Sequence, residues 1–262
     1  MKEPFYDYFI RSCWEGRTDT PSAIGAKFLK TLDALSGIDP IFADWSIIDA
    51  RGRSSAPLVA ARPRIAAVVE NNPARDDYDE PDPVRGYHVC GMAGEFRDPR
   101  SVTLNVDAGG KFAGGTRLKF GAYDVAPDLA IVTYPIFKAA LLAINAIWLA
   151  PWACAPAIRT GTVAVPINIG GAQAFRIDSV RQVPSDPTFP ESMFHIPWLA
   201  YLSAPLAAGV KLAPEILTER TPDGGLLMSA TTERLDPLNP EHVRRARILA
   251  ETMIACTGVS SR

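Results

Sequence analysis

The feature that most restricts the fold of this chain is a run without charged residues from Ala139 to Ile158. Such a run either crosses a membrane or lies inside a protein core. Prolines decide between the two, because Pro135 precedes the run while Pro151 and Pro156 interrupt its second half. The helix that fits between them is about 24 Å long at about 1.5 Å per residue, shorter than the roughly 30 Å core of a bilayer. We therefore predict a buried core helix over 135–150 and no membrane partner.

Composition places the chain among ordinary globular proteins. Hydrophobic residues make up 47% and charged residues 21% of 262, and 23 prolines favour many short elements over a bundle of long helices. A formal charge of -2 argues against direct nucleic-acid binding, which usually requires a basic excess. The four cysteines lie far apart in the sequence, which favours reduced buried thiols over a redox pair or a zinc knuckle. With a charged N-terminus that shows no secretion signal, we expect a cytoplasmic protein.

Local signals predict both helices and strands. A capping residue followed by proline starts two helices, one from Thr20-Pro21 to Gly37 and one from Asn239-Pro240 to about Cys256. A short helix is predicted from Asp39-Pro40 through Trp45, and helical pattern returns between Pro57 and Asn72. Strands are predicted over 5–14, 87–92, 102–106, 116–123, 162–169, 174–180 and 198–203, with a hairpin of 215–219 and 226–232 around the turn at 222–225.

The order of these elements indicates the fold class. Helices flank a strand-rich middle without strict alternation of strand and helix, so we predict an α+β fold with a mainly antiparallel sheet. The first 72 residues supply too few strands to close a core alone. We therefore expect one domain over 1–262, with its core at 5–256 and an acidic loop at 73–85.

That loop is the most unusual charged segment of the chain. Without its five acids, the remaining 24 acidic residues would face 27 basic ones, so the acidic excess is concentrated there. Such a local field is typical of a docking site for a basic partner, although charge runs are also often solvated linkers. A basic group just before it, Arg51 to Arg64, can also pair with it internally. The predicted partner-binding residues are Asp76, Asp77, Tyr78, Asp79, Glu80 and Asp82.

Searches for catalytic and metal-binding motifs give little. The chain has no GxSxG or HExxH pattern, and the acidic loop lacks the mid-loop glycine and distal glutamate of an EF-hand. No lysine has an acidic residue two positions earlier, so a restriction-type nuclease site is not indicated. We read His88 as a partly buried structural residue and His242 as a solvated one. We expect no catalytic residue, metal or cofactor.

Several segments carry a family resemblance. CWEGR at the end of the first strand, FLKTLDALSGIDPIFADW and RGRS resemble the start of the bacterial polymorphic-toxin immunity protein 52 family. PDGGLLMSATTE and NPEHVRRARILAETM resemble its later part. These segments are spread over about Tyr8 to Cys256, while the middle, from about Val84 to Pro197, carries no matching segment.

The resemblance implies an α+β cytoplasmic protein that binds and neutralises a cognate toxin. Toxins paired with this family are often restriction-endonuclease-like nucleases, delivered by contact-dependent routes such as type VI secretion. The family provides no catalytic or binding residue to transfer to this chain. Two other classes stay open: an adaptor or chaperone that loads an effector onto a secretion machine, and an enzyme with a dispersed site around His88 and His195.

Overall fold

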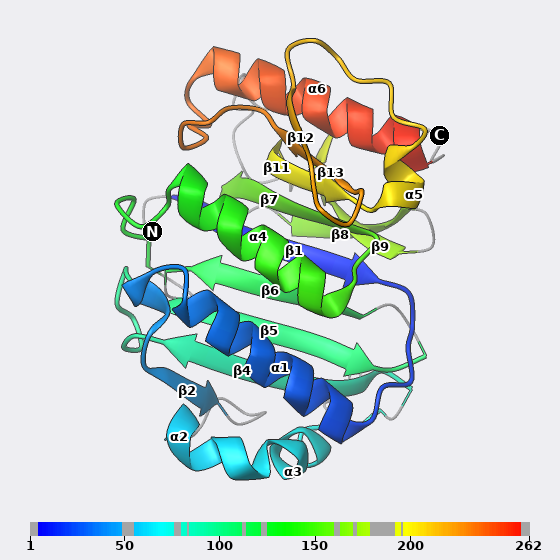
Figure 1. Cartoon of the computed structure of the whole chain (residues 1–262). Helices are drawn as coiled ribbons and strands as arrows, with labels where there is room; N and C mark the ends of the chain where they lie inside the picture. The colour runs from blue at the N-terminus through cyan, green and yellow to red at the C-terminus, as the bar shows by residue number, and fades with distance from the viewer. Residues whose placement is uncertain are drawn as a thin grey trace.

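The first strand of the chain lies in the middle of the sheet. A computed structural model describes residues 5–48, 55–75, 80–82, 84–111, 114–121, 125–159, 163–169, 172–178, 192–194 and 196–257. Within these ranges ten strands form one sheet in the order β12-β13-β11-β7-β1-β6-β5-β4-β2-β3 (Figure 1). Its strands are β1 (Tyr6–Trp14), β2 (Trp45–Ile48), β3 (Ser55–Pro57), β4 (Gly86–Ala93), β5 (Val102–Gly109), β6 (Gly114–Phe120), β7 (Trp152–Arg159), β11 (Ile196–Leu202), β12 (Leu217–Arg220) and β13 (Leu226–Ser229).

All pairings between these strands are antiparallel, as predicted. β1 pairs with β6 on one side and with β7 on the other, so the N-terminal strand closes a core built from later segments. A second sheet, also antiparallel, has the order β10-β9-β8. It consists of β8 (Val163–Ile169), β9 (Ala172–Asp178) and β10 (Ser192–Phe194). The α+β class and the single domain are therefore confirmed.

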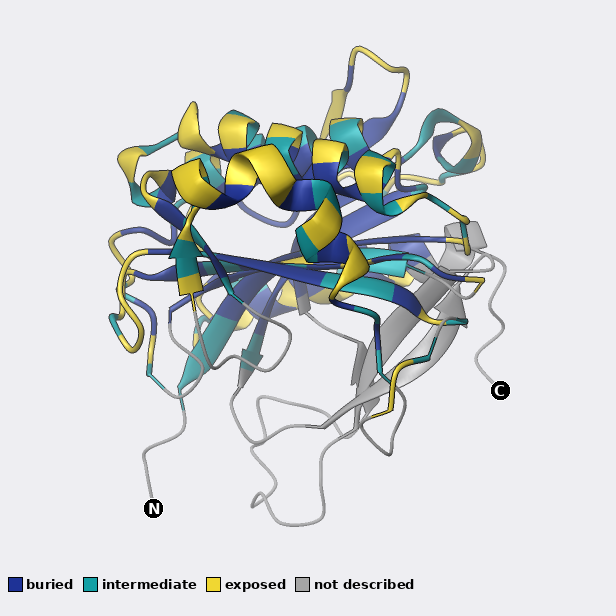
Figure 2. Cartoon of the chain, turned by 90° about the horizontal axis from the view of Figure 1, so that it is seen from below, coloured by how far each residue is buried: buried dark blue, intermediate teal, exposed yellow. Residues whose placement is uncertain are grey.

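Helices cover one face of the large sheet. In Figure 1, α1 and α4 lie side by side across its strands, and Figure 2 shows the exposed residues of the helices on their outer side. α6 packs against β11 and β13, and α3 packs against α1 and β4. The helices are α1 (Pro21–Ser36), α2 (Leu58–Ala61), α3 (Ile65–Glu70), α4 (Tyr134–Trp148), α5 (Ala204–Ala207) and α6 (Pro240–Thr257), with 3-10 turns η1 (Pro40–Phe42) and η2 (Arg62–Arg64).

The predicted helix starts are confirmed. Thr20 Oγ1 accepts a hydrogen bond from Ala23 N at 3.3 Å at the start of α1. Asn239 Oδ1 accepts one from Glu241 N at 3.0 Å at the start of α6. In both helices a side chain thus satisfies a backbone N–H that has no partner within the helix.

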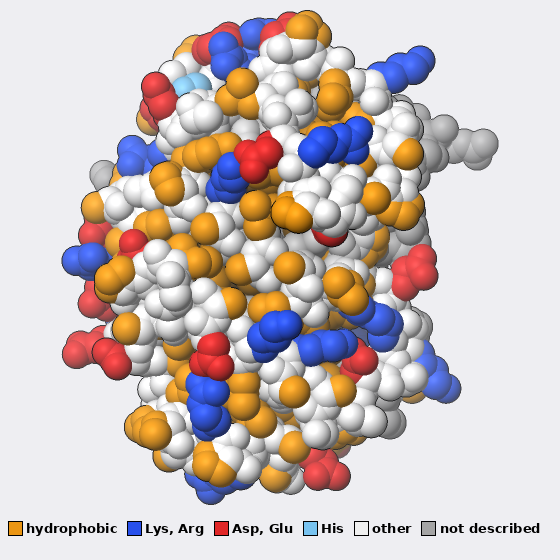
Figure 3. Space-filling model, in the orientation of Figure 1, with side chains coloured by type: hydrophobic (Ala, Val, Ile, Leu, Met, Phe, Trp, Pro, Cys, Tyr) orange, Lys and Arg blue, Asp and Glu red, His pale blue; other side chains and the backbone are white. Residues whose placement is uncertain are grey.

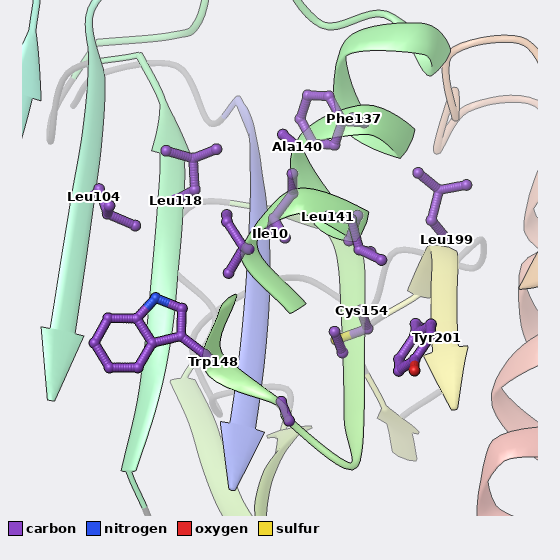
Figure 4. Packing of buried hydrophobic residues seen from close by; sticks show 14 of the residues in the cluster. Ile10, Leu104, Leu118, Phe137, Ala140, Leu141, Trp148, Cys154, Leu199 and Tyr201 are labelled. Atoms are coloured by element: carbon purple, nitrogen blue, oxygen red, sulfur yellow. The ribbon is translucent and has the colours of Figure 1, made fainter. Parts of the chain in front are cut away.

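The core lies between the sheet and its helical layer. α4 is the predicted apolar helix, and its Phe137, Leu141 and Trp148 point toward Ile10 and Leu118 of the sheet (Figure 4). The five tryptophans are each at most 4% exposed, which confirms that they are core residues. In the described part of the chain, no helix is both long and apolar enough to cross a membrane.

One strand was missed, and one short helix was predicted too long. Residues 152–159 form β7, a strand between β1 and β11, where the sequence suggested only the broken end of an apolar run. A strand that has neighbours on both sides and is covered on both faces carries apolar residues at every position. The alternation of apolar and polar residues that marks a half-buried strand is then missing from the sequence. Trp45 begins β2 and does not continue the helix of Asp39-Pro40, which ends as a 3-10 turn at Phe42.

Candidate functional site

The acidic loop joins the helical segment 57–72 to β4. Of its six predicted partner-binding residues, Asp76, Asp77, Tyr78 and Asp79 lie outside the described residues, while Glu80 and Asp82 are described. The chain approaches itself at two isolated antiparallel bridges, Pro73 with Tyr87 and Arg75 with Pro81. We call the residues that close this loop, 73–75 and 81–87 apart from Pro83, the neck.

Asp82 and Arg85 hold the neck together. Asp82 N donates to Ala74 O at 2.7 Å, and Asp82 Oδ1 accepts from Val84 N at 2.8 Å. Arg85 Nε lies 3.3 Å from Asp82 Oδ2, and Arg85 Nη1 donates to Arg75 O at 3.2 Å. The Asp82 carboxylate is therefore used within the neck, whereas Glu80 is exposed.

Within the described residues, Asp82 of the acidic loop pairs with Arg85, a basic residue that the sequence did not single out. Arg62, one of the predicted internal counterparts, donates through Nη1 to Asp33 Oδ2 at 3.1 Å and through Nη2 to Asp33 Oδ1 at 2.5 Å. Arg51 and Arg53 lie outside the described residues. In the part of the chain that the structure describes, Arg85, three residues after Asp82, is placed beside the Asp82 carboxylate.

The turn between β5 and β6 braces the neck against the sheet. Lys111 N donates to Val84 O at 2.8 Å. Gly110 lies so close that a Cβ there would be 2.5 Å from Arg85 C, which only glycine permits. β5 and β6, on either side of this turn, pair antiparallel. The neck is thus held by hydrogen bonds and close backbone contacts.

His88 stands one residue beyond the neck, on β4. Its Nδ1 lies 2.8 Å from Asp107 Oδ1 on the paired strand β5, where His88 and Asp107 are register partners. Burial acts to lower the pKa of His88, but the hydrogen bond and charge of Asp107 outweigh it and raise the pKa above its ordinary value. The predicted structural role of His88 agrees with this pairing.

The His88–Asp107 pair makes stability depend on pH. Because the folded-state pKa is raised, the stabilisation is fully present below about pH 6.5 and is lost as pH rises through the folded pKa. We expect Asp107→Asn to lower the free energy of unfolding by about 0.5 kcal/mol at pH 5.5 and by much less at pH 9, since the pair is partly exposed. Urea titrations at both pH values measure this difference.

Asp128→Asn is the matched control, because Asp128 Oδ2 lies 3.7 Å from Arg100 Nε, a group that stays charged throughout this range. Its effect should be the same at pH 5.5 and pH 9. An equally pH-independent effect of Asp107→Asn would contradict the assignment of the pH dependence to His88.

The sheet face opposite the helices carries a second ion pair. Leu118 and Phe120 of β6 point toward the helices, so Arg117 and Lys119 point the other way. Lys119 Nζ lies 3.2 Å from Asp7 Oδ1, with their side chains only 10% and 15% exposed. Lys119 is therefore nearly buried although it lies on the sheet face opposite the helices. Burial raises the pKa of Asp7, and the Lys119 ammonium opposes this rise.

Two further residues bear on the alternative of a dispersed enzyme site. Cys90 follows His88 on the same face of β4, but burial and the Asp107 charge raise the pKa of its thiol to about 12, which makes it a poor nucleophile. His195 lies outside the described residues. Across the described ranges, no three His, Cys, Asp or Glu side chains come together as metal ligands would.

His242 was predicted as a solvated residue, and this was wrong. Its side chain is 12% exposed, and its Nδ1 accepts a hydrogen bond from Asp236 N at 3.1 Å. It therefore fastens the loop before α6 to the first turn of that helix. The partner is a backbone N–H in an irregular loop, which no sequence motif marks.

Comparisons with known proteins give a likeness in fold. The Pseudomonas aeruginosa T6SS protein PA0821 superposes with a TM-score of 0.51 and 10% sequence identity, covering 97% of this chain and 73% of that one. At this identity the likeness concerns the fold alone. No protein-family model and no curated protein matches the chain. Membership of the immunity protein 52 family therefore stays a prediction.

Proposed function

We propose that this chain is an immunity protein that acts in the cytoplasm and neutralises a toxin of a type VI secretion system by stoichiometric binding. Two observations support a link to secretion: the fold likeness to a T6SS protein over 97% of the chain, and the segments that resemble an immunity family. In this proposal the chain acts by binding and has no catalytic activity of its own.

The observation that carries the proposal is the neck of the acidic loop. The closure of the chain between Arg75 and Pro81, together with the Asp82–Arg85 pair, keeps both ends of the segment with Asp76, Asp77, Tyr78 and Asp79 in place. A segment with fixed ends loses less conformational entropy when a partner orders it. The neck thus favours a docking element over a solvated linker.

The proposed partner is a nuclease toxin, because its chemistry complements this charge. A nuclease must attract phosphates and so presents a positive groove. Carboxylates at 76–80 offer that groove negative charge in place of nucleic acid, and their field increases the association rate. Tyr78 adds contact area at a low cost in side-chain entropy.

Neutralising the loop tests this mechanism. We expect Asp76→Asn, Asp77→Asn, Asp79→Asn and Glu80→Gln together to lower the association rate with the cognate nuclease toxin, isolated by co-purification with the wild-type chain, by about tenfold or more at low salt. The difference should shrink as salt screens the charges. Asp82 is left unchanged, because its carboxylate holds the neck. Stopped-flow association and a nuclease assay at equal molar amounts give the two readouts.

The control removes the same number of charges elsewhere, with Gln in place of the exposed Glu95, Glu215, Glu233 and Glu251. This variant should keep the wild-type association rate. If neutralising the loop changes no more than this control does, the loop is not the contact. If the wild-type chain binds the toxin and leaves its nuclease activity intact, the adaptor function replaces immunity.

A further inference from the structure

The end of α4 carries an apolar residue in an unfavourable place. Leu149 follows the helix in the left-handed conformation, with φ of 50°, and its side chain is 73% exposed. Glycine or asparagine usually occupies this position, because a bulky side chain there is strained. Leu149 therefore combines backbone strain with exposure of apolar surface, and neither stabilises the fold. Such an outlier suggests a function outside the folded core.

Leu149 stands on a rigid base. Trp148 before it is fully buried and stacks on Trp14 of β1, with ring centroids 5.1 Å apart and planes 4° from parallel. Trp148 Nε1 donates to Thr31 Oγ1 at 2.9 Å, and Leu149 N donates to Asn145 O at 2.8 Å. A side chain presented from a fixed base loses little entropy on binding, which is a property of interface hot spots.

Cations lie beside this position. Arg17 Nη2 donates to Trp148 O at 2.7 Å, while its guanidinium lies 4.8 Å from the centre of the Trp14 ring. Lys27 Nζ lies 5.7 Å from the centre of the Trp148 ring and 3.0 Å from Asp19 Oδ2. Figure 3 shows lysine and arginine side chains gathered where α1 and the end of α4 lie side by side. Two cations, Arg17 and Lys27, therefore lie around the tryptophan pair that precedes Leu149, with Asp19 as the acidic partner of Lys27.

This surface is continuous with the neck of the acidic loop. A Cβ at Gly109 would lie 2.9 Å from Asp19 O, so the β5–β6 turn touches the segment before α1. The next residue, Gly110, touches Arg85 of the neck. Contacts therefore lead from Asp82 through Arg85 and the turn to Asp19. Asp19 in turn pairs with Lys27, and its N donates to Arg17 O at 2.9 Å.

We propose that Leu149 is the apolar anchor of the surface that binds the toxin, and that it enters an apolar pocket bordered by carboxylates. In the complex, the carboxylates of the toxin would face Arg17 and Lys27 of this chain, and the basic groove of the toxin would face the acidic loop. This inference rests on the proposed function, since it names the same toxin as the partner. It adds a second contact of opposite charge, which fixes the orientation of the complex.

Binding measurements with matched leucines test the anchor. Leu149→Ala should weaken binding of the cognate nuclease toxin, isolated by co-purification with the wild-type chain, by about tenfold or more, as is typical when a hot-spot side chain is truncated. Leu149→Met should bind like wild type. Leu238→Ala, in the loop before α6, is the control, because Leu238 is 68% exposed and undergoes the same chemical change. Biolayer interferometry measures all three variants.

Leu149→Gly separates the role in binding from a role in folding. Because glycine removes the left-handed strain, this variant should unfold at a higher urea concentration than wild type while it binds the toxin more weakly. A lower unfolding midpoint together with unchanged binding would mean that Leu149 serves the fold, and would overturn the proposal.

The outcomes distinguish this inference from the proposed function. If wild type does not bind the toxin, both fail. If wild type binds and Leu149→Ala binds equally well, the anchor fails and the proposed function stands. If toxin binding is unchanged but Leu149→Ala abolishes self-association in sedimentation experiments, the occupant is a second copy of this chain and the proposal is wrong.

Discussion

Replacing Trp148 by alanine should lower the free energy of unfolding by about 4 kcal/mol, the largest loss that we expect from a single substitution. Its side chain is fully buried, stacks on Trp14 and donates to Thr31. Alanine would leave a cavity between β1 and the end of α4, because the sheet and the helix are both held by other contacts and cannot collapse onto it. Urea denaturation at equilibrium measures the loss.

Two controls accompany this variant. Thr31→Val removes the acceptor of the Trp148 hydrogen bond together with the hydrogen bond that Thr31 Oγ1 donates to Lys27 O at 2.8 Å, and should cost about 1 to 2 kcal/mol. Leu238→Ala truncates an exposed side chain and should change stability by less than about 0.5 kcal/mol. A loss for Trp148→Ala no larger than that of Thr31→Val would show that the stacked pair contributes little to packing.

Lys119→Met should have the second-largest effect, a loss of about 3 kcal/mol at pH 7. The substitution leaves the Asp7 carboxylate nearly buried without its cation. Burial already raises the pKa of Asp7, and without Lys119 it should rise further. Below the unfolded-state pKa of about 3.9, the Asp7 carboxyl is protonated in both the folded and the unfolded state. Its raised folded-state pKa therefore does not lower the free energy of unfolding there. The loss grows as pH rises from the unfolded pKa to the folded pKa, and it is constant above the folded pKa.

Urea titrations at pH 4 and pH 7 measure this dependence, with the smaller loss expected at pH 4. The double variant Asp7→Asn with Lys119→Met removes both charges and should recover much of the stability at pH 7. Equal losses at the two pH values, or a double variant no more stable than the single one, would mean that the lost contact is apolar packing of the lysine stem.

Much of the fold was predictable because its signals are local. Thr20-Pro21 and Asn239-Pro240 start helices through side chains that bond N–H groups two or three residues away. Leu118 and Phe120 revealed the buried face of β6 by their spacing. The turn at 222–225 joins β12 to β13 as predicted, and Asp223 Oδ2 there accepts from the Tyr201 hydroxyl at 2.5 Å.

β7 shows where such signals fail. Pro156 made a strand improbable, because proline cannot donate a ladder hydrogen bond. In the sheet Pro156 faces Pro197 of β11, beside an irregularity in the register. The two residues that lack an N–H are thus opposite each other. Only the pairing of segments about forty residues apart makes this proline compatible with the sheet.

The candidate site also has features that the sequence predicts and features that only the structure shows. The carboxylates at 76–82 stood out in the sequence, and their role in binding stays a prediction. The neck that holds them did not stand out, because it depends on a backbone bridge between Arg75 and Pro81. Leu149 gave no signal either, since a positive φ angle leaves no mark on a leucine in a sequence.

The amino-acid sequence by itself determined the helix starts, the strand faces, the α+β class and the concentration of acidic charge in one loop. These properties depend on residues only a few positions apart, and the local backbone conformation sets how the side chains of such residues lie relative to one another. Only the tertiary structure decided that β1 and β7 lie side by side, that Lys119 is buried against Asp7, and that Arg85 closes the acidic loop. Each of these depends on atoms brought together by packing, and partners such as Asp7 and Lys119 share no local pattern.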